Sequence, residues 1–424
     1  MPTHTPTAQS GTTRLSGFDS LRAVAMLLGV VLHVSLAFMP GIDRFIGWPM
    51  IDSSPHPLFG LVVVAIHAVR MPLFFFVSGL LTALSIGSGG PGRALRSRLT
   101  RIGVPFLVGL VTILPLIRFA AAFAVTHGGA QSDEGAWAVF IADYQSDSFI
   151  GRLSPGHLWF LEYLLIFVVA ACIVFACFAR AGRAMTKTPW KRSTMMWANL
   201  VAVGLAVFFM SRMKSVGIDT PESIIPDWHL LGFYGVFFAG GCIAAFKAPN
   251  LTELIPFPRT AAALGVVLTI GCAFGAIIAD GMARGINMPM VTGAAAFIKP
   301  FNLVGQAFLW IAILGTCAWA ARPRPPLSGF ASRVFRSAYW TYLVHLPIAW
   351  ILHALLRDVG GDSGLAGVMR FLLVIFATLV VSQITFEAFV ARTPLGRFLD
   401  LKPRNSMDNA RTRPANTEAR RPVN

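Results

Sequence analysis

Residues 19–33 read DSLRAVAMLLGVVLH, and the fold of the chain can be worked out from this stretch. Arg22 lies near its start, ten mostly apolar residues follow, and His33 closes it. In a helix that rises 1.5 Å per residue, His33 lies roughly 16 Å along the axis from Arg22. The apolar run continues through Phe38, so the segment is long enough to cross a bilayer. We therefore expect Arg22 at one membrane boundary and His33 well inside the hydrocarbon.

A histidine at that depth indicates a functional site, because a titratable imidazole inside a membrane needs a partner or a water-filled cavity. The structural alternative is that Arg22 anchors the interface while His33 bonds to a neighbouring helix. These two residues alone leave both interpretations open.

The composition of the whole chain is that of a polytopic membrane protein. Of its 424 residues, 55% are hydrophobic and 13% are charged, and the mean hydropathy is +0.66. Soluble proteins carry about 25% charged residues. The apolar residues fall in blocks of about 20, the length of a transmembrane helix. The five cysteines all fall in these blocks without metal-ligand spacing, so we expect neither a disulfide nor a metal site.

The apolar blocks predict an all-α bundle of about ten spans. The first runs to residue 38, and the others cover approximately 58–85, 102–125, 156–179, 195–212, 229–247, 260–279, 298–320, 337–356 and 366–391. We expect a disordered N-terminus over residues 1–16, a membrane domain over 17–400 and a disordered basic tail over 401–424.

The loop charges predict the orientation of the bundle. Basic residues gather in alternate loops, as at 93–101, 180–192 and 322–336, and again in the tail. The intervening loops carry acidic residues instead, such as Asp52, Asp143 and Asp219. Because basic loops stay in the cytoplasm, both termini are expected there, with the acidic loops outside. The net charge of +16 is thus a topology signal, and no nucleic-acid partner is expected.

With this orientation, the ionisable and aromatic residues of several spans form a track across the membrane. His67 and Arg70 lie on one face of span two, near the midplane. The track runs from Arg22 inside to the start of span four outside, and its members beyond span two are His157, Trp159, Glu162, Tyr342 and His345. It would suit a proton relay, a transported solute, or a reaction whose two substrates arrive from opposite sides.

Some of these residues also have a simpler, structural interpretation, whereas Arg70 does not. Arg70 in mid-membrane costs on the order of 3 kcal/mol to insert, which favours a function. His67 could simply hydrogen-bond a neighbouring helix, and Trp159 could belong to an interfacial belt. Arg98 and Arg101 could anchor the cytoplasmic face or bind an anion. The phenylalanines at 74–76 are expected to be packing residues, and Ser78-Gly79 a close approach of helices.

These residues resemble the integral-membrane acyltransferase family 3, whose signature is an Arg and a His separated by ten residues in the first span. Arg22 and His33 match it. The likeness continues in RMPLFFFVSGLL (70–81), RLTRIGVPF (98–106), GHLWFLEYLL (156–165) and YWTYLVHLPI (339–348). Within the family, the chain is most similar to the glucan biosynthesis protein C branch.

The resemblance implies a bacterial-type inner-membrane enzyme that moves an acyl group from cytoplasmic acyl-CoA to a hydroxyl of an extracytoplasmic carbohydrate. In the glucan branch the group is succinyl, and no residue pattern here distinguishes succinyl from acetyl. No cofactor is expected besides acyl-CoA as co-substrate. His33 would be a general base, and Arg70 would stabilise the oxyanion or pair with an acyl carboxylate. Arg22, with Arg98 and Arg101, would hold the phosphates of the donor.

The alternative from another functional class is a proton-coupled transporter or exporter of an anionic or carbohydrate solute. Such proteins are often built from two repeated halves with paired broken helices. No such repeat is evident in this sequence, although the track of polar residues would serve either function.

Overall fold

The computed structural model describes residues 10–127, 135–180, 190–247, 255–283, 294–322, 329–393 and 396. Ten helical segments there are long and apolar enough to cross a membrane, which confirms an all-α ten-span bundle. The helices are α1 (Ser10–Leu36), α2 (Ile42–Ile46), α3 (Leu58–Gly89), α4 (Pro91–Arg98), α5 (Val104–His127), α6 (Ala136–Ser146), α7 (Phe149–Arg152), α8 (Trp159–Arg180), α9 (Arg192–Met210), α10 (Trp228–Lys247), α12 (Pro258–Ala283), α13 (Ile298–Ala320), α14 (Gly329–Leu356) and α15 (Gly364–Phe386). A π-helix (Leu99–Gly103) joins α4 to α5, and another (Glu387–Ala391) extends α15.

The first helix begins before the predicted start of the membrane domain. Its backbone is helical from Ser10, within the segment expected to be disordered. Extending an existing helix adds one hydrogen bond per residue, which offsets the modest helix propensity of Ser and Thr. Residues 1–9 and the basic tail over 401–424 lie outside the described residues.

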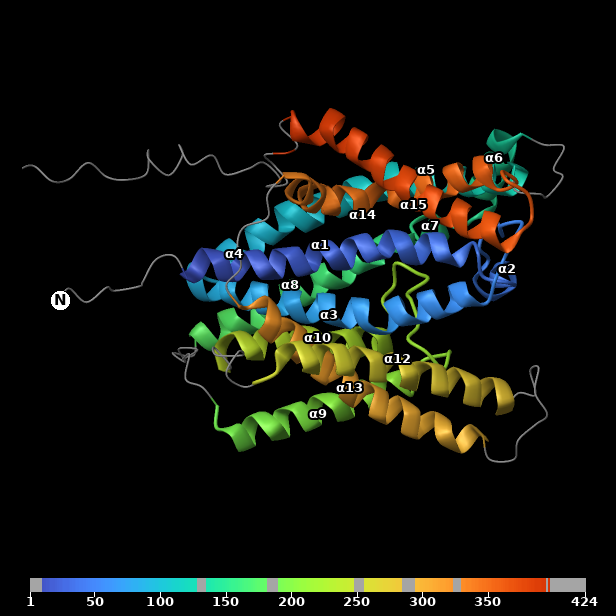
Figure 1. The fold of residues 1–424 in the computed structure, drawn as a ribbon. Coiled ribbons are helices and arrows are strands. Elements are labelled where there is room, and N and C mark those ends of the chain that lie inside the picture. The colour runs from blue at the N-terminus through green and yellow to red at the C-terminus, as the bar shows by residue number, and fades with distance from the viewer. Residues whose placement is uncertain are drawn as a thin grey trace, which may run out of the picture.

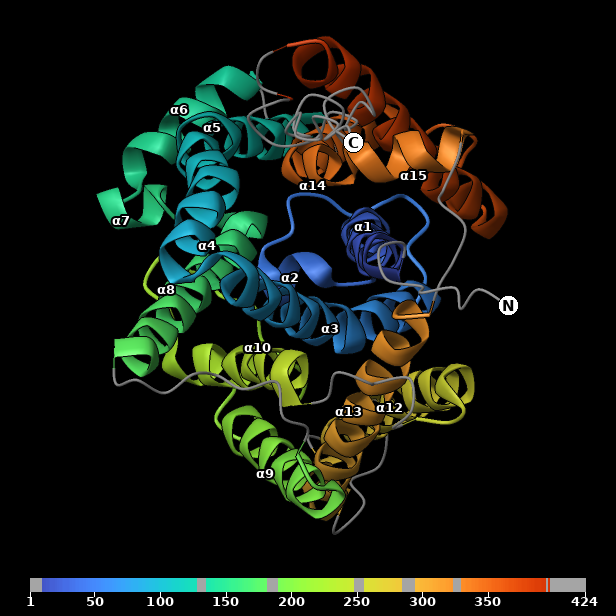
Figure 2. The same ribbon diagram turned by 90° about the vertical axis from the view of Figure 1, so that its left-hand side faces the viewer.

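The long helices run side by side, and α1 begins on the same side on which α15 ends (Figure 1). Seen from that side, α1 lies inside the bundle, between α3 and the pair α14 and α15, whereas α9, α12 and α13 lie beyond α3 and α10 (Figure 2). Helix α1 contacts both α3 and α14. One side of α1 therefore faces other spans, while Val24 and Leu28 lie on an exposed side.

Small residues let α3 and α10 approach closely, as expected for Ser78-Gly79. A Cβ added at Gly79 would lie 2.0 Å from the carbonyl oxygen of Phe238, and one added at Gly241 would lie 1.9 Å from that of Phe76. Both obstacles are backbone atoms, so neither site tolerates a side chain. Without a hydrophobic drive between helices in lipid, such close packing is a main source of association.

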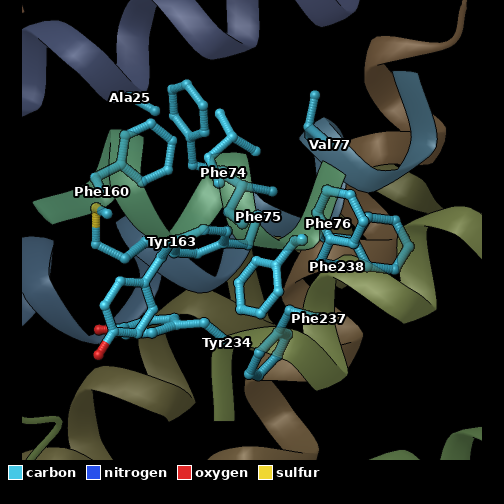
Figure 3. Packing of buried hydrophobic residues seen from close by; sticks show 14 of the residues in the cluster. Ala25, Phe74, Phe75, Phe76, Val77, Phe160, Tyr163, Tyr234, Phe237 and Phe238 are labelled. Atoms are coloured by element: carbon cyan, nitrogen blue, oxygen red, sulfur yellow. The ribbon is translucent and has the colours of Figure 1, made fainter. Parts of the chain in front are cut away.

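Beside this contact lies an aromatic core made by α3, α8 and α10 (Figure 3). Phe75 is fully buried, with its ring centroid 4.8 Å from that of Tyr234 and 5.4 Å from that of Phe167. Phe74 meets Phe160 edge to face at 4.4 Å, a geometry that aromatic quadrupoles favour. The packing role predicted for the phenylalanines at 74–76 is confirmed.

A buried ionic network ties the loop after α1 to α14 and α15. Asp52 in this loop accepts hydrogen bonds from Arg370 of α15, at 2.7 and 3.1 Å, and its Oδ2 lies 2.8 Å from Nε2 of His353 on α14. Arg370 also donates to the hydroxyls of Ser53 and Ser54. Burial alone would raise the pKa of Asp52, but the hydrogen bonds from His353 and Arg370 hold that pKa below its ordinary value of 3.8. The carboxylate is therefore the charged partner that Arg370 requires.

We predict that Asp52→Asn destabilises the protein by about 3–5 kcal/mol, because it leaves the guanidinium of Arg370 buried without its counter-charge. Thermal unfolding in detergent measures the loss. Asp358→Asn is the matched control, since that carboxylate is 70% exposed and such pairs contribute at most about 1 kcal/mol. Because the pKa of Asp52 is lowered in the folded state, its contribution is complete above pH 3.8 and is lost as the pH falls through the folded pKa. Equal unfolding temperatures for the two variants would contradict a structural role for this network.

The orientation of the bundle also has a direct test. We expect a cysteine introduced at Asp143, which is exposed beside α5, to react with an impermeant thiol reagent added outside intact cells. A cysteine at Arg96, exposed on α4, should react only after the membrane is opened. Both variants need a background without the five native cysteines, since Cys177 is itself exposed. The reverse labelling pattern would overturn the orientation.

Candidate active site

A cavity of about 550 Å³ lies within the bundle, against α1, α3, α8 and α14. Residues of the loop after α1 and of the segment between α9 and α10 complete its wall. Of the eleven site residues predicted from the sequence, the cavity brings together His33, His67, Arg70, His157, Trp159 and Tyr342. The other five are not among its lining residues.

His33, which lines the cavity, is held by a hydrogen bond to His345, which does not line it. Nδ1 of His33 lies 2.7 Å from Nε2 of His345, and the two rings stack with centroids 5.0 Å apart. Nδ1 of His345 lies 2.8 Å from the carbonyl oxygen of Tyr342, which can only accept, so this nitrogen carries a proton. In neutral His345, Nε2 is then an acceptor, and Nδ1 of His33 must be the donor. This assignment leaves Nε2 of His33 unprotonated, in a residue that lines the cavity.

His157 is anchored to the same turn of α14. Its Nε2 donates to the carbonyl oxygens of Tyr342 and Leu343, at 3.0 and 3.2 Å. The Leu343 carbonyl is available because Pro347, four residues later, has no N–H to offer it. The hydroxyl of Tyr342 donates in return to the His157 carbonyl at 2.7 Å. Nδ1 of His157 is buried and has no partner among the described residues.

Arg70 enters the cavity one helical turn from His33. A Cβ at Gly29 would lie 2.3 Å from Nη1 of Arg70, so the guanidinium rests directly on the backbone of α1 at this glycine. Gly29 precedes His33 by four residues and shares its face of the helix. Within the part of the chain that the structure describes, no hydrogen bond or ion pair to Arg70 is found, and its Nε is buried without a partner. An uncompensated guanidinium beside an imidazole makes this end of the cavity suitable for an anion.

His67 lies on α3 one helical turn before Arg70 and has the simpler role considered for it. Its Nε2 donates to the carbonyl of Ile218 at 2.7 Å, which fixes the segment between α9 and α10 against α3. It also borders a second cavity of about 120 Å³, which Gln306 and Asn302 help to line. His67 therefore has a structural partner, unlike Arg70.

The three arginines predicted to bind a donor gather around the N-terminal half of α1, on the side of His33 away from the loop after α1. Arg22, Arg98 and Arg101 interact electrostatically with one another, and Nη1 of Arg22 lies 3.8 Å from Asp19. Arg101 belongs to the π-helix Leu99–Gly103, a distortion often found at functional sites. Arg22 does not line the cavity. Phe74 does, and the Arg22 guanidinium lies 5.7 Å from the centroid of its ring, so Phe74 adjoins both sites.

Two predicted residues of α8 have different surroundings from those expected. Trp159 is 6% exposed and packs against Tyr163 and Tyr234, so it belongs to the aromatic core and not to an interfacial belt. Trp159 is buried because it lies on the same inward face of α8 as Tyr163, one turn later. Glu162 is 8% exposed, and its Oε2 has no hydrogen-bond partner in the described chain. It is absent from the cavity lining, which separates it from the other polar groups.

The sequence did not identify Gly29, Trp48, Trp350 or the Asp52 network. Trp48 lies in the loop after α1 and Trp350 on α14, and both line the cavity. Arg370 could have been noticed as a charge within an apolar span, but its partner Asp52 is 318 residues away in the chain. Within the described residues, no cluster of three or more His, Cys, Asp or Glu could hold a metal ion.

The sequence of the chain is also similar to those of known proteins. A family model described as an acyltransferase domain matches residues 15–387. The chain is 24% identical over 388 residues to "Glucans biosynthesis protein C" of Salmonella heidelberg (strain SL476), covering 90% of this chain and 93% of the relative. The protein of the same name from Salmonella schwarzengrund (strain CVM19633) is 24% identical over 371 residues, covering 84% and 90%. No solved structure matches.

Proposed function

This chain belongs to the integral-membrane acyltransferase family 3, and from that premise we propose that it transfers an acyl group from cytoplasmic acyl-CoA to a hydroxyl of an extracytoplasmic carbohydrate. It is a multi-pass membrane acyltransferase, so the transporter that the residues alone left open is set aside. The donor, the acceptor and a bacterial inner-membrane location are parts of the proposal.

The observation that carries the proposal is the pairing of an unprotonated ring nitrogen with an unpaired guanidinium in one cavity. Nε2 of His33 is free to take a proton because Nδ1 is committed to His345. Arg70, one turn away along α1, has no carboxylate to neutralise it among the described residues. A base for a hydroxyl and a cation for a developing oxyanion are what acyl transfer requires.

These groups suggest a sequence of proton and bond changes. Nε2 of His33 removes the proton from the acceptor hydroxyl as its oxygen attacks the thioester carbonyl. Arg70 stabilises the tetrahedral oxyanion. When the oxyanion collapses, the carbon–sulfur bond breaks, and the imidazolium of His33 returns its proton to the departing CoA thiolate. His345 is a positioning residue, because it is fully buried and acts only through its hydrogen bond to His33.

Donor entry is assigned to the cluster of Arg22, Arg98 and Arg101. Their guanidinium groups suit the phosphates of CoA, and Arg22 lies 11 residues, or roughly 16 Å of helix, before His33. The acyl end would then pass Phe74 to reach Arg70. Phe74 is 4% exposed, so its side chain must move to admit the thioester.

The acceptor is proposed to be a glucan, because the relatives that match over nine-tenths of the chain are named for glucan biosynthesis. Succinyl is proposed as the acyl group, since Arg70 has no partner of its own and could pair with a terminal carboxylate. An acetyl group has no terminal carboxylate, so the charge of Arg70 would then stabilise the oxyanion alone. The two donors thus predict different effects of mutating Arg70.

We predict that His33→Ala lowers the rate of acyl transfer by about 10² to 10⁴, the usual contribution of a general base. Release of free CoA from acyl-CoA with a glucan acceptor, by purified protein, measures this rate. His345→Ala should lower it too, because Nδ1 of His33 loses its acceptor. His127→Ala is the control, since that histidine is exposed at the end of α5. Normal turnover by His33→Ala would move the base elsewhere, with His157 as the first alternative because its Nδ1 is unpaired.

We predict that Arg70→Gln shifts the donor preference from succinyl-CoA toward acetyl-CoA, whereas Arg22→Gln weakens both donors in proportion. A hydrogen bond to a charged group contributes roughly 1.5 to 3 kcal/mol, which corresponds to about tenfold or more in selectivity. Measuring kcat/KM for each variant with each donor separates the two effects. Arg96→Gln, on the exposed face of α4, is the control. If Arg70→Gln slows both donors equally, Arg70 serves the oxyanion and the succinyl assignment loses its residue-level support.

A further inference from the structure

The cavity has a second recognition feature on the side of His33 away from Arg22. Helices α1 and α14 lie side by side, and three pairs of residues mark successive levels along α14. Arg22 interacts with Tyr339 at the first level, His33 bonds to His345 at the second, and Trp48 meets Trp350 at the third. The tryptophans are therefore separated from the arginine cluster by the reacting groups. A ligand that they hold would approach His33 from the side opposite the donor.

Both tryptophans are held in defined positions. Their ring centroids lie 5.0 Å apart in an edge-to-face arrangement, and Trp48 also stacks on the ring of His33 at 6.3 Å. Trp350 belongs to the well-packed α14. Trp48 follows Gly47, whose φ of 62° makes the turn that a residue with a side chain would resist. The Asp52 network then fixes the same loop four residues later.

The chemistry of this pair points to a ligand with hydroxyl groups. Both indole N–H groups are buried and have no acceptor among the described residues, although both side chains line the cavity. Buried indole N–H groups usually find a partner. Because both nitrogens are inaccessible here, a rotation of each ring toward the cavity is needed for an occupant to supply the missing acceptor. A lipid chain or an organic cation could use the aromatic faces but would offer no acceptor. A sugar ring offers both an apolar C–H face and hydroxyl oxygens.

The neighbouring lining residues suit the same ligand. Glu222, in the segment between α9 and α10, lines the cavity and is exposed, so its carboxylate can accept hydrogen bonds from hydroxyl groups. Ser154 also lines it and holds this segment by donating to the Glu222 carbonyl at 2.6 Å. Aromatic walls with a few placed polar groups are typical of small-ligand sites.

We propose that Trp48 and Trp350 form the acceptor subsite, in which one sugar ring stacks on indole, accepts from the indole N–H groups, and presents a hydroxyl to Nε2 of His33. This assignment rests on the proposed function, because it names the residues that select a carbohydrate acceptor for the same reaction. It places acceptor recognition on the side of His33 away from the arginine cluster that would bind the donor.

The test combines binding without chemistry and turnover. A glucose oligosaccharide is titrated by calorimetry into the full-length protein in lipid nanodiscs, with no acyl-CoA present. We expect Trp48→Ala and Trp350→Ala each to weaken binding by about tenfold or more, through lost stacking and a lost donor. Trp48→Phe and Trp350→Phe keep an aromatic face and lose only the N–H, so they should cost about two- to tenfold. Trp228→Ala is the control, since that tryptophan is 59% exposed and absent from the cavity.

In turnover, the alanine variants should raise the KM for the oligosaccharide by the same factor while changing the KM for acyl-CoA less than twofold. Oligosaccharide binding that survives in both alanine variants overturns the subsite and leaves the proposed function intact. An equal rise in both KM values also overturns it, because it indicates a general distortion. If wild-type protein acylates another acceptor and binds no oligosaccharide, the proposed function itself fails along with the subsite.

Discussion

Inside a membrane bundle, every polar group must find its partner within the protein, and this constraint shapes the whole molecule. The backbone groups of the spans satisfy it largely through the hydrogen bonds of the helices themselves. Where a charge is buried, as with Arg370, it is surrounded by a carboxylate, hydroxyls and carbonyls. Arg70 is the contrast, since it is half-buried at a cavity wall with no such shell. The difference separates a charge that stabilises the fold from one available to a ligand.

The same constraint explains how the proposed base is prepared. His33 would be costly in lipid without a partner, and His345 supplies one across 312 residues of sequence. The chain of hydrogen bonds ends at a backbone carbonyl, which cannot change its role as an acceptor. One fixed acceptor therefore sets the tautomers of two histidines. Pro347 leaves the Leu343 carbonyl free as a second anchor nearby, so α14 holds both His345 and His157 from one turn.

Much of the fold could be predicted from the sequence because length and hydropathy alone define a membrane span. The ten apolar blocks correspond to ten spans, and six of the eleven site residues predicted from the sequence line one cavity. The pairing of side chains from different helices could not be predicted, because the partners are far apart in the sequence, as Asp52 and Arg370 are at 318 residues. Glu162 had the right chemistry but lies away from the cavity, because its direction depends on packing around α8. Gly265 and Gly315 make a tight α12–α13 contact that the sequence analysis did not identify.

We propose that one cavity joins two substrates that arrive from opposite sides of the membrane. The most direct measurement uses proteoliposomes of uniform orientation, with acyl-CoA on the side of the Arg22 cluster and a glucan on the side of Trp48. The account predicts that acylated glucan forms with the substrates separated in this way, and that none forms when their sides are exchanged. Product that forms only when both substrates share one side would contradict it.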